Sequence, residues 1–277
     1  MSRVIAIGAL GGSGTRAVAQ ILIEAGIHLG DLLNSANDNL VFTRLFKDPA
    51  FRERATPGEI RQRLSLFRQY MESGRLSPIE ALELVRASMR NPTIGTGRRF
   101  LGRLTARLLA PERPRETWGW KEPNTQIYLA EIDDFFPDLK YLHVVRHGLD
   151  MALSRNKSQL FNWGHLYGIH ARPDMPQDEL AYWQLEYWVR STRDVLEKSR
   201  RMRGDFLLVN HSLLGEEPEE QVRRMLEFLE LELPDEKVRA LAEIPRVPPT
   251  SGRYRNQDPA IFDRAQIDFV RELGFEV

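Results

Sequence analysis

The sequence predicts an α/β fold: a single domain over residues 1–277 with a central parallel β-sheet flanked by helices. Short apolar runs alternate with longer segments that have apolar residues at helical spacing, as in a parallel sheet with helical crossovers. No repeat, low-complexity stretch or linker divides the chain. Residues from about 40 to 110 show only helical patterns, so we expect a helical insertion there that caps the sheet.

Each element has its own signal. The run from Arg3 to Ala9 is β-branched and apolar, which is typical of a strand buried on both faces. A glycine-rich turn over residues 8–16 follows, and a helical pattern from Ala17 ends at Gly26. The other expected elements are strands at 117–121, 140–145 and 205–209, and helices at 126–136, 177–202, 217–231 and 260–273.

Composition narrows the function classes. Hydrophobic residues make up 42% and charged residues 28%, and the 39 basic residues balance 39 acidic ones. This balance argues against a large nucleic-acid face. Because the chain has no cysteine, disulfides, thiolate zinc sites and iron–sulfur clusters are excluded. No apolar run approaches 18 residues and no signal-peptide pattern is present, so we expect a cytoplasmic protein without a membrane partner.

Three predicted strands end in residues suited to binding anions. The glycine turn follows the first strand, Lys121 ends the second, and Arg146 follows the third. Ligands of open parallel sheets bind beyond the carboxyl ends of the strands. If these strands are neighbours, a turn rich in free amides, a lysine and an arginine meet at one edge. That arrangement suits a polyanionic nucleotide.

The glycine turn has a physical use at the start of a helix. Gly11, Gly12 and Gly14 leave backbone N–H groups unshielded, so that they can bind a phosphate together with the helix dipole. Ser13 and Thr15 add hydroxyl donors, and Arg16 adds a forked cation.

The turn departs from two common nucleotide motifs. A nucleoside-triphosphate P-loop needs a lysine where Thr15 follows Gly14. Residues 12–17 fit the dinucleotide pattern G-x-G-x-x-A, but a polar loop at 34–39 stands where a second strand with an acidic end is expected. The match to this pattern keeps open the alternative of an NADP-type Rossmann oxidoreductase, in which Arg16 would bind the 2′-phosphate.

Several motifs together resemble the sulfotransferases that use 3′-phosphoadenylyl sulfate. Residues 11–16, Gly-Gly-Ser-Gly-Thr-Arg, resemble their 5′-phosphosulfate loop. The segment from Arg146 to Ser154 resembles their 3′-phosphate motif, a strand-end arginine with a serine eight residues later on the next helix. Residues 120–123, Trp-Lys-Glu-Pro, are similar to the lysine strand of the family, and 208–232 to its late strand and helix.

The resemblance implies a fold, an activity and a donor site. It covers the sheet scaffold from residue 4 to about 255, without residues 40–110, and implies the P-loop-like sulfotransferase fold. The activity implied is transfer of a sulfuryl group from 3′-phosphoadenylyl sulfate to a hydroxyl or amine of a small-molecule or glycan acceptor. We expect the helical insertion at about 40–110 on the acceptor side. Adenosine 3′,5′-bisphosphate is the product and no metal is needed. The donor residues implied are residues 11–16, Arg146, Ser154 and Arg253, the last in a late basic loop.

The catalytic residues are less directly implied. The family usually has lysine or arginine where this chain has Gly12, so we expect Lys121 or Arg16 to supply the cation. Asp38 is our candidate base, because several Golgi-type relatives place a catalytic glutamate at a comparable distance after the loop. Other interpretations stay open: a Lys121–Glu122 ion pair, an acidic partner for Arg146, plain turn chemistry around Asp38. The remaining functional alternative is a non-catalytic nucleotide-binding protein, in which the loss of the basic residue at position 12 has removed turnover.

Overall fold

A computed structural model describes residues 3–89, 98–111 and 114–277. Its contacts divide the chain into two compact units. Unit 1 consists of Met1–Ala9, Thr15–His143 and Met202–Leu207, and unit 2 of Leu10–Gly14, Val144–Arg201 and Leu208–Val277. The single-domain organisation over residues 1–277 stays a prediction.

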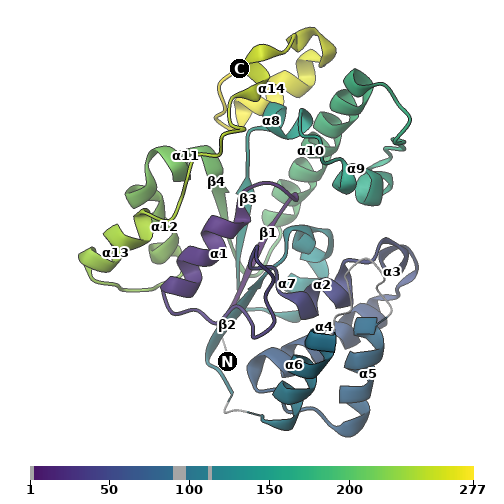
Figure 1. The fold of residues 1–277 in the computed structure, drawn as a ribbon, viewed down its shortest axis with the longest axis vertical. Coiled ribbons are helices and arrows are strands. Elements are labelled where there is room, and N and C mark those ends of the chain that lie inside the picture. Colours follow the sequence, from purple (N-terminus) through teal and green to yellow (C-terminus); the bar gives the residue numbers. More distant parts are fainter. Residues whose placement is uncertain (1–2, 90–97, 112–113) are drawn as a thin grey trace. The chain divides into compact units, whose positions relative to one another are not determined.

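The sheet has four parallel strands in the order β2-β1-β3-β4 (Figure 1). The strands β1 and β2 pair in parallel, from Arg3 opposite Thr117 to Ile7 opposite Lys121. The predicted fold class, a parallel sheet flanked by helices, is confirmed. All four strands lie within one residue of their predicted ends: β1 (Arg3–Ala9), β2 (Thr117–Lys121), β3 (Leu139–Val145) and β4 (Asp205–Asn210).

The burial of β1 and β2 explains why their apolar runs form strands. Residues 4–9 of β1 are buried, and Trp118 and Trp120 of β2 are completely buried. Gly119 lies between the two tryptophans, where a Cβ would collide with the carbonyl oxygen of Ile5 on β1. The close pairing of β1 and β2 therefore requires a glycine at this position.

The helix after the glycine turn is α1 (Thr15–Glu24). Its buried face contains Val18, Ile21 and Leu22, which lie at helical spacing. Gly26 follows with a φ of +93°, a conformation that favours glycine, so the predicted end of this helix is confirmed.

Helices are the only regular elements in the described residues 40–89 and 98–109, as the sequence pattern predicted (Figure 1). Aromatic rings attach them to β2: Phe42 stacks on Trp120 at 5.2 Å between centroids, and Phe67 contacts Trp120 edge-on at 5.3 Å. The helices are α2 (Leu40–Phe46), α3 (Pro49–Arg54), α4 (Pro57–Glu72), α5 (Pro78–Met89) and α6 (Arg98–Leu109).

Two elements connect β2 to β3 within unit 1. The first is the 3₁₀ helix η1 (Pro123–Tyr128), and the second is α7 (Leu129–Phe135). The predicted helix at 126–136 is therefore partly 3₁₀, because Pro123 and the Glu122 cap start the tighter turn ahead of it.

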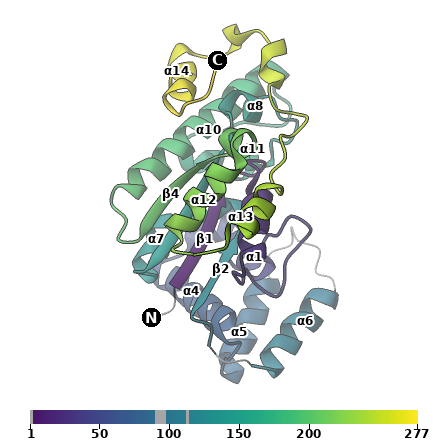
Figure 2. The ribbon, with the colours of Figure 1, turned by 90° about the vertical axis from the view of Figure 1, so that its left-hand side faces the viewer.

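Unit 2 is built around the long helix α10 (Gln177–Ser199), which packs against α8 (Gly148–Ala152) and α14 (Arg264–Glu272) (Figure 2). The sequence predicted α10, α12 and α14 but not the short helices of five to eight residues. The remaining elements are α9 (Ser158–Trp163), η2 (Gly164–Tyr167), α11 (His211–Glu216), α12 (Pro218–Phe228), α13 (Asp235–Ala242), η3 (Arg253–Asn256) and η4 (Pro259–Ile261).

Candidate active site

The glycine turn has backbone geometry suited to an anion. Gly12 and Gly14 have φ values of +96° and +87°, and the Ser13 amide donates to the Leu10 carbonyl at 3.1 Å. A Cβ at Gly14 would also collide with the ring of His211, so both conformation and space require glycine there. Gly12 is exposed, which leaves the outer side of the turn open to a ligand.

The turn leads directly into α1. Thr15 is buried as the first residue of this helix, whereas Arg16 is exposed. The first turn of α1 contains no acidic residue, so no carboxylate on the helix opposes an anion at its N-terminus. Binding of phosphate by Thr15 and Arg16 stays a prediction.

Arg146 is a buried cation that faces the glycine turn within unit 2. Its guanidinium donates to the Gly12 carbonyl at 3.3 Å and to the Thr250 hydroxyl at 2.9 Å. Its Nε is buried without a hydrogen-bond partner. Burial lowers the pKa of Arg146, the negative charge of Asp150 raises it, and the positive charge of Arg253 lowers it.

The predicted alternative of an acidic partner for Arg146 is wrong in the part of the chain that the structure describes. Asp150 influences Arg146 through its charge but does not form a salt bridge with it; one Asp150 oxygen accepts the Gly252 amide at 2.9 Å instead. A buried cation without a carboxylate partner is costly unless an anion binds beside it.

Ser154 lies in the loop after α8, and not on a helix as the sequence predicted. The helix ends at Ala152, and two cations bind the carbonyl groups at its C-terminal end. Lys157 donates to the Ala152 carbonyl, and Arg253 donates to the Leu153 carbonyl at 3.3 Å. Ser154 and Arg253 line one open pocket of about 230 Å³, so these two predicted donor residues lie together.

Lys121 and Asp38, predicted separately as cation and base, form an ion pair in unit 1. The Lys121 ammonium also donates to the Ala36 carbonyl at 2.8 Å. The side chain of Lys121 is 2% exposed and that of Asp38 is 16% exposed. Burial lowers the pKa of Lys121, while the charges of Asp38 and Glu122 raise it and that of Lys47 lowers it.

The predicted alternative of a Lys121–Glu122 ion pair is wrong, because Glu122 pairs with Lys47 at 3.0 Å. Two lysine–carboxylate pairs therefore form at the end of β2. The turn chemistry predicted around Asp38 is present as well: Asn34 donates to Asp38 Oδ2 at 2.8 Å and accepts the Asp38 amide at 2.9 Å. The turn holds the Asp38 carboxylate in position to bind Lys121.

The dinucleotide alternative requires a second strand soon after α1. Between α1 and α2 the structure has only an isolated bridge of Leu33 with Asn39, and β2 begins at residue 117. The ribose-binding acidic residue of a Rossmann fold therefore has no strand to follow.

The family of this chain follows from a comparison of its sequence with known protein families. The sequence model of the sulfotransferase family matches residues 5–235, which is most of the chain. The chain belongs to the sulfotransferase family. The resemblance predicted from the motifs is confirmed, and the protein is an enzyme of the sulfotransferase class. A comparison with curated proteins gives no significant match.

Solved structures of sulfotransferases are similar to this one. The sulfotransferase STF9 from Mycobacterium avium aligns with a TM-score of 0.50 and 14% identity, over 100% of this chain and 77% of that one. The sulfotransferase domain from the curacin biosynthetic pathway gives 0.48 and 13%, over 100% of this chain and 98% of that one. The similarity to STF9 supports the P-loop-like sulfotransferase fold.

Sequence reasoning left His211 of this sulfotransferase unassigned. It is the first residue of α11, directly after β4, and its ring lies against Gly14. Burial, and then the charge of Arg146, lowers the pKa of His211 to about 4, so the ring is neutral near pH 7. Lys121 and Arg146 were selected because ligands of parallel sheets bind beyond the carboxyl ends of the strands. His211 also follows a strand end, so the same rule could have identified it.

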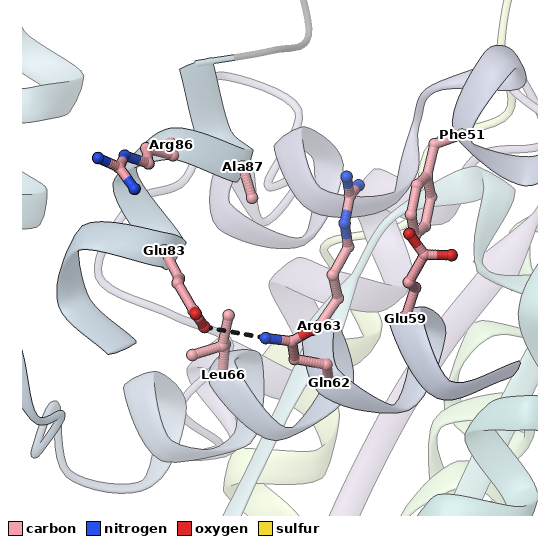
Figure 3. Close-up of a pocket in the computed structure, with 8 residues that line it drawn as sticks. All are labelled: Phe51, Glu59, Gln62, Arg63, Leu66, Glu83, Arg86 and Ala87. Carbon is pink, nitrogen blue, oxygen red and sulfur yellow. Dashed lines mark hydrogen bonds between the residues drawn. The ribbon is translucent and has the colours of Figure 1, made fainter. Parts of the chain in front are cut away.

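The insertion of this sulfotransferase contains a pocket of about 240 Å³ between α3, α4 and α5 (Figure 3). Gln62 and Glu83 form a hydrogen bond of 3.0 Å across it. That this segment binds the acceptor stays a prediction. The pocket is lined by Phe51, Glu59, Gln62, Arg63, Leu66, Glu83, Arg86 and Ala87.

The described residues contain neither a metal-holding cluster of side chains nor a membrane-spanning helix. Within residues 3–89, 98–111 and 114–277, no group of three or more histidine, aspartate or glutamate residues is placed to hold a metal ion. No helix in the same ranges is long and apolar enough to cross a membrane.

Proposed function

We propose that this sulfotransferase transfers a sulfuryl group from 3′-phosphoadenylyl sulfate to a hydroxyl or amine of a small-molecule acceptor. The observation that supports the donor most strongly is the buried Arg146. It contacts the glycine turn through Gly12 and has no carboxylate partner in the described residues. A phosphate group would supply the missing negative charge.

The donor has two anionic groups, the 5′-phosphosulfate and the 3′-phosphate, and each has its own set of candidate residues. The amides of the glycine turn, with Ser13 and Thr15, bind the 5′-phosphosulfate. Arg146, Ser154 and Arg253 bind the 3′-phosphate, which distinguishes this donor from ATP. His211 lies against the turn and is neutral near pH 7, so it can contribute hydrogen bonds from its ring nitrogens but no charge.

In the proposed reaction the acceptor atom forms a bond to sulfur while the bond from sulfur to the bridging oxygen breaks. Asp38 accepts the proton of the acceptor, and adenosine 3′,5′-bisphosphate leaves. Lys121, assisted by Arg16, stabilises the negative charge that grows on the sulfuryl and bridging oxygens. The Lys121–Asp38 pair keeps both groups in place before substrates bind, since burying either charge alone is costly.

Ligand-induced stabilisation tests the donor class directly. Adenosine 3′,5′-bisphosphate should raise the melting temperature, whereas NADPH should leave it unchanged. Saturation at about 100 times the dissociation constant adds roughly 2.7 kcal/mol to the stability of a protein. Release of the bisphosphate from the donor in the presence of phenols, sugars and amines then identifies the acceptor. Stabilisation by NADPH alone would contradict the proposal.

The Asp38→Asn variant should slow turnover and move the alkaline limb of its pH profile to lower pH. Burial lowers the pKa of Lys121 and the Asp38 charge raises it, so removing that charge lowers this pKa further. The ammonium, active in its protonated form, is then lost at a lower pH than in the wild type.

The measurement is kcat at saturating substrates between pH 6 and 10. The exposed Asp134→Asn, which removes a surface carboxylate of the same unit, is the matched control and should keep the wild-type profile. An unchanged alkaline limb in Asp38→Asn would show that Lys121 is not the titrating cation.

A further inference from the structure

The pocket beside Ser154 contains a buried lysine, Lys157, that is not among the predicted donor residues. It lies within unit 2, where α8 packs on α10 (Figure 2). Residues after α8, the start of α10 and η3 form its walls, and its volume is about 230 Å³. Its lining residues are Ala152, Leu153, Ser154, Arg155, Lys157, Gln177, Asp178, Ala181, Arg253 and Gln257.

Lys157 is the buried cation of this pocket, with 8% of its surface exposed. Its ammonium donates to the Ala152 carbonyl, which uses one of its three N–H groups. In the ranges that the structure describes, no carboxylate forms a salt bridge with it. A lysine in this position is costly without an anion.

Positive charge dominates around Lys157. Arg253 on η3 and Arg155 in the loop line the pocket, and Asp178 at the start of α10 is its one lining carboxylate and is exposed. The other polar lining residues, Ser154, Gln177 and Gln257, are uncharged. The Arg253 charge lowers the pKa of both Lys157 and Arg146. Arg253 is thus electrostatically coupled to two buried cations, and a dianion would relieve the repulsion among all three.

We propose that Lys157 is a further donor-binding residue: together with Ser154 and Arg253 it binds the 3′-phosphate, and it takes up a proton when the nucleotide binds. This inference rests on the proposed function. A phosphate monoester is dianionic above pH 7, and it matches a pocket lined by three cations, a hydroxyl and amide side chains. Binding places negative charge beside Lys157, which favours its protonated form.

The sign of the proton linkage follows from burial. Burial, and then the charge of Arg253, lowers the pKa of Lys157 to about 8 in the free protein. Below this value Lys157 is already charged, so binding near pH 7 takes up almost no proton. At pH 9 most of the lysine is neutral in the free protein and becomes charged in the complex, so uptake approaches one proton. The bisphosphate Kd should therefore rise about fivefold from pH 8 to pH 9.

Calorimetry in two buffers of different ionisation enthalpy measures this uptake, with adenosine 3′,5′-bisphosphate and adenosine 5′-monophosphate as ligands. Lys157→Met should weaken bisphosphate binding about tenfold or more at pH 7, and monophosphate binding much less. Its proton uptake at pH 9 should be lost. Lys157→Arg keeps the charge but does not titrate, so it should bind the bisphosphate without proton uptake. Lys198→Met, on α10 in an ion pair with Asp194, is the matched control and should behave as the wild type.

The outcomes separate the two proposals. If the wild type binds no bisphosphate at any pH, the proposed function fails. If it binds but Lys157→Met retains the affinity and the proton uptake, only the role of Lys157 is overturned. Equal losses for both nucleotides would mean that Lys157 supports the packing at the end of α8, which also overturns the inference.

Discussion

The Arg146→Ala variant should bind adenosine 3′,5′-bisphosphate about 30- to 700-fold more weakly than the wild type. This range corresponds to roughly 2 to 4 kcal/mol, the cost of removing one partner from a buried charge pair. Arg146 is 8% exposed and donates to Gly12 and Thr250, so its charge is held at the glycine turn rather than in solvent. Binding of adenosine 5′-monophosphate, which lacks the 3′-phosphate, should change much less.

The comparison of the two nucleotides, measured by calorimetry, separates recognition from folding. Arg172→Ala is the matched control, because Arg172 is an exposed arginine of the same unit that pairs with Asp174. It should leave both affinities unchanged. Arg146→Lys should restore part of the bisphosphate affinity, since lysine retains the positive charge but lacks the planar guanidinium that binds an anion with two N–H groups. Equal losses for both nucleotides in Arg146→Ala would mean that Arg146 holds the turn and does not bind the 3′-phosphate.

The strands and the order of the motifs could be predicted because their signals are local. The β-branched run of β1 and the tryptophans of β2 suit strands wherever the rest of the chain lies. Gly26 ends α1 through its own backbone conformation, at a φ of +93°. The candidate anion-binding residues were selected because they follow strand ends, a rule that depends on topology alone.

The errors involve contacts between residues distant in sequence. Lys121 pairs with Asp38, which is 83 positions away, rather than with the adjacent Glu122. Ser154 lies beyond the end of α8, where Arg253 of η3, about a hundred residues later, binds the Leu153 carbonyl. No local pattern encodes such partners. The short helices α8 and α9 were missed because five or six residues do not complete two turns of apolar periodicity.

Lys121→Ala should lower kcat about 100-fold or more, the range for loss of one positioned stabiliser of a transition state. The resemblance implies a basic residue at the position of Gly12, and the buried Lys121 at the end of β2 is our candidate for the missing cation. Charge on the sulfuryl and bridging oxygens grows only as the bond breaks. The ammonium therefore contributes more in the transition state than in the ground state, and donor affinity should fall less than about tenfold.

Lys47→Ala is the matched control for this prediction. Lys47 is a second lysine at the end of β2, paired with Glu122 at 3.0 Å, but its side chain is 29% exposed and no catalytic role is assigned to it. Its removal should change kcat far less than removal of Lys121. If Lys121→Ala instead abolishes donor binding and leaves kcat at saturation unchanged, Lys121 only anchors the donor. The catalytic cation would then be Arg16, and Arg16→Ala, measured in the same way, should show the loss of kcat that Lys121→Ala did not.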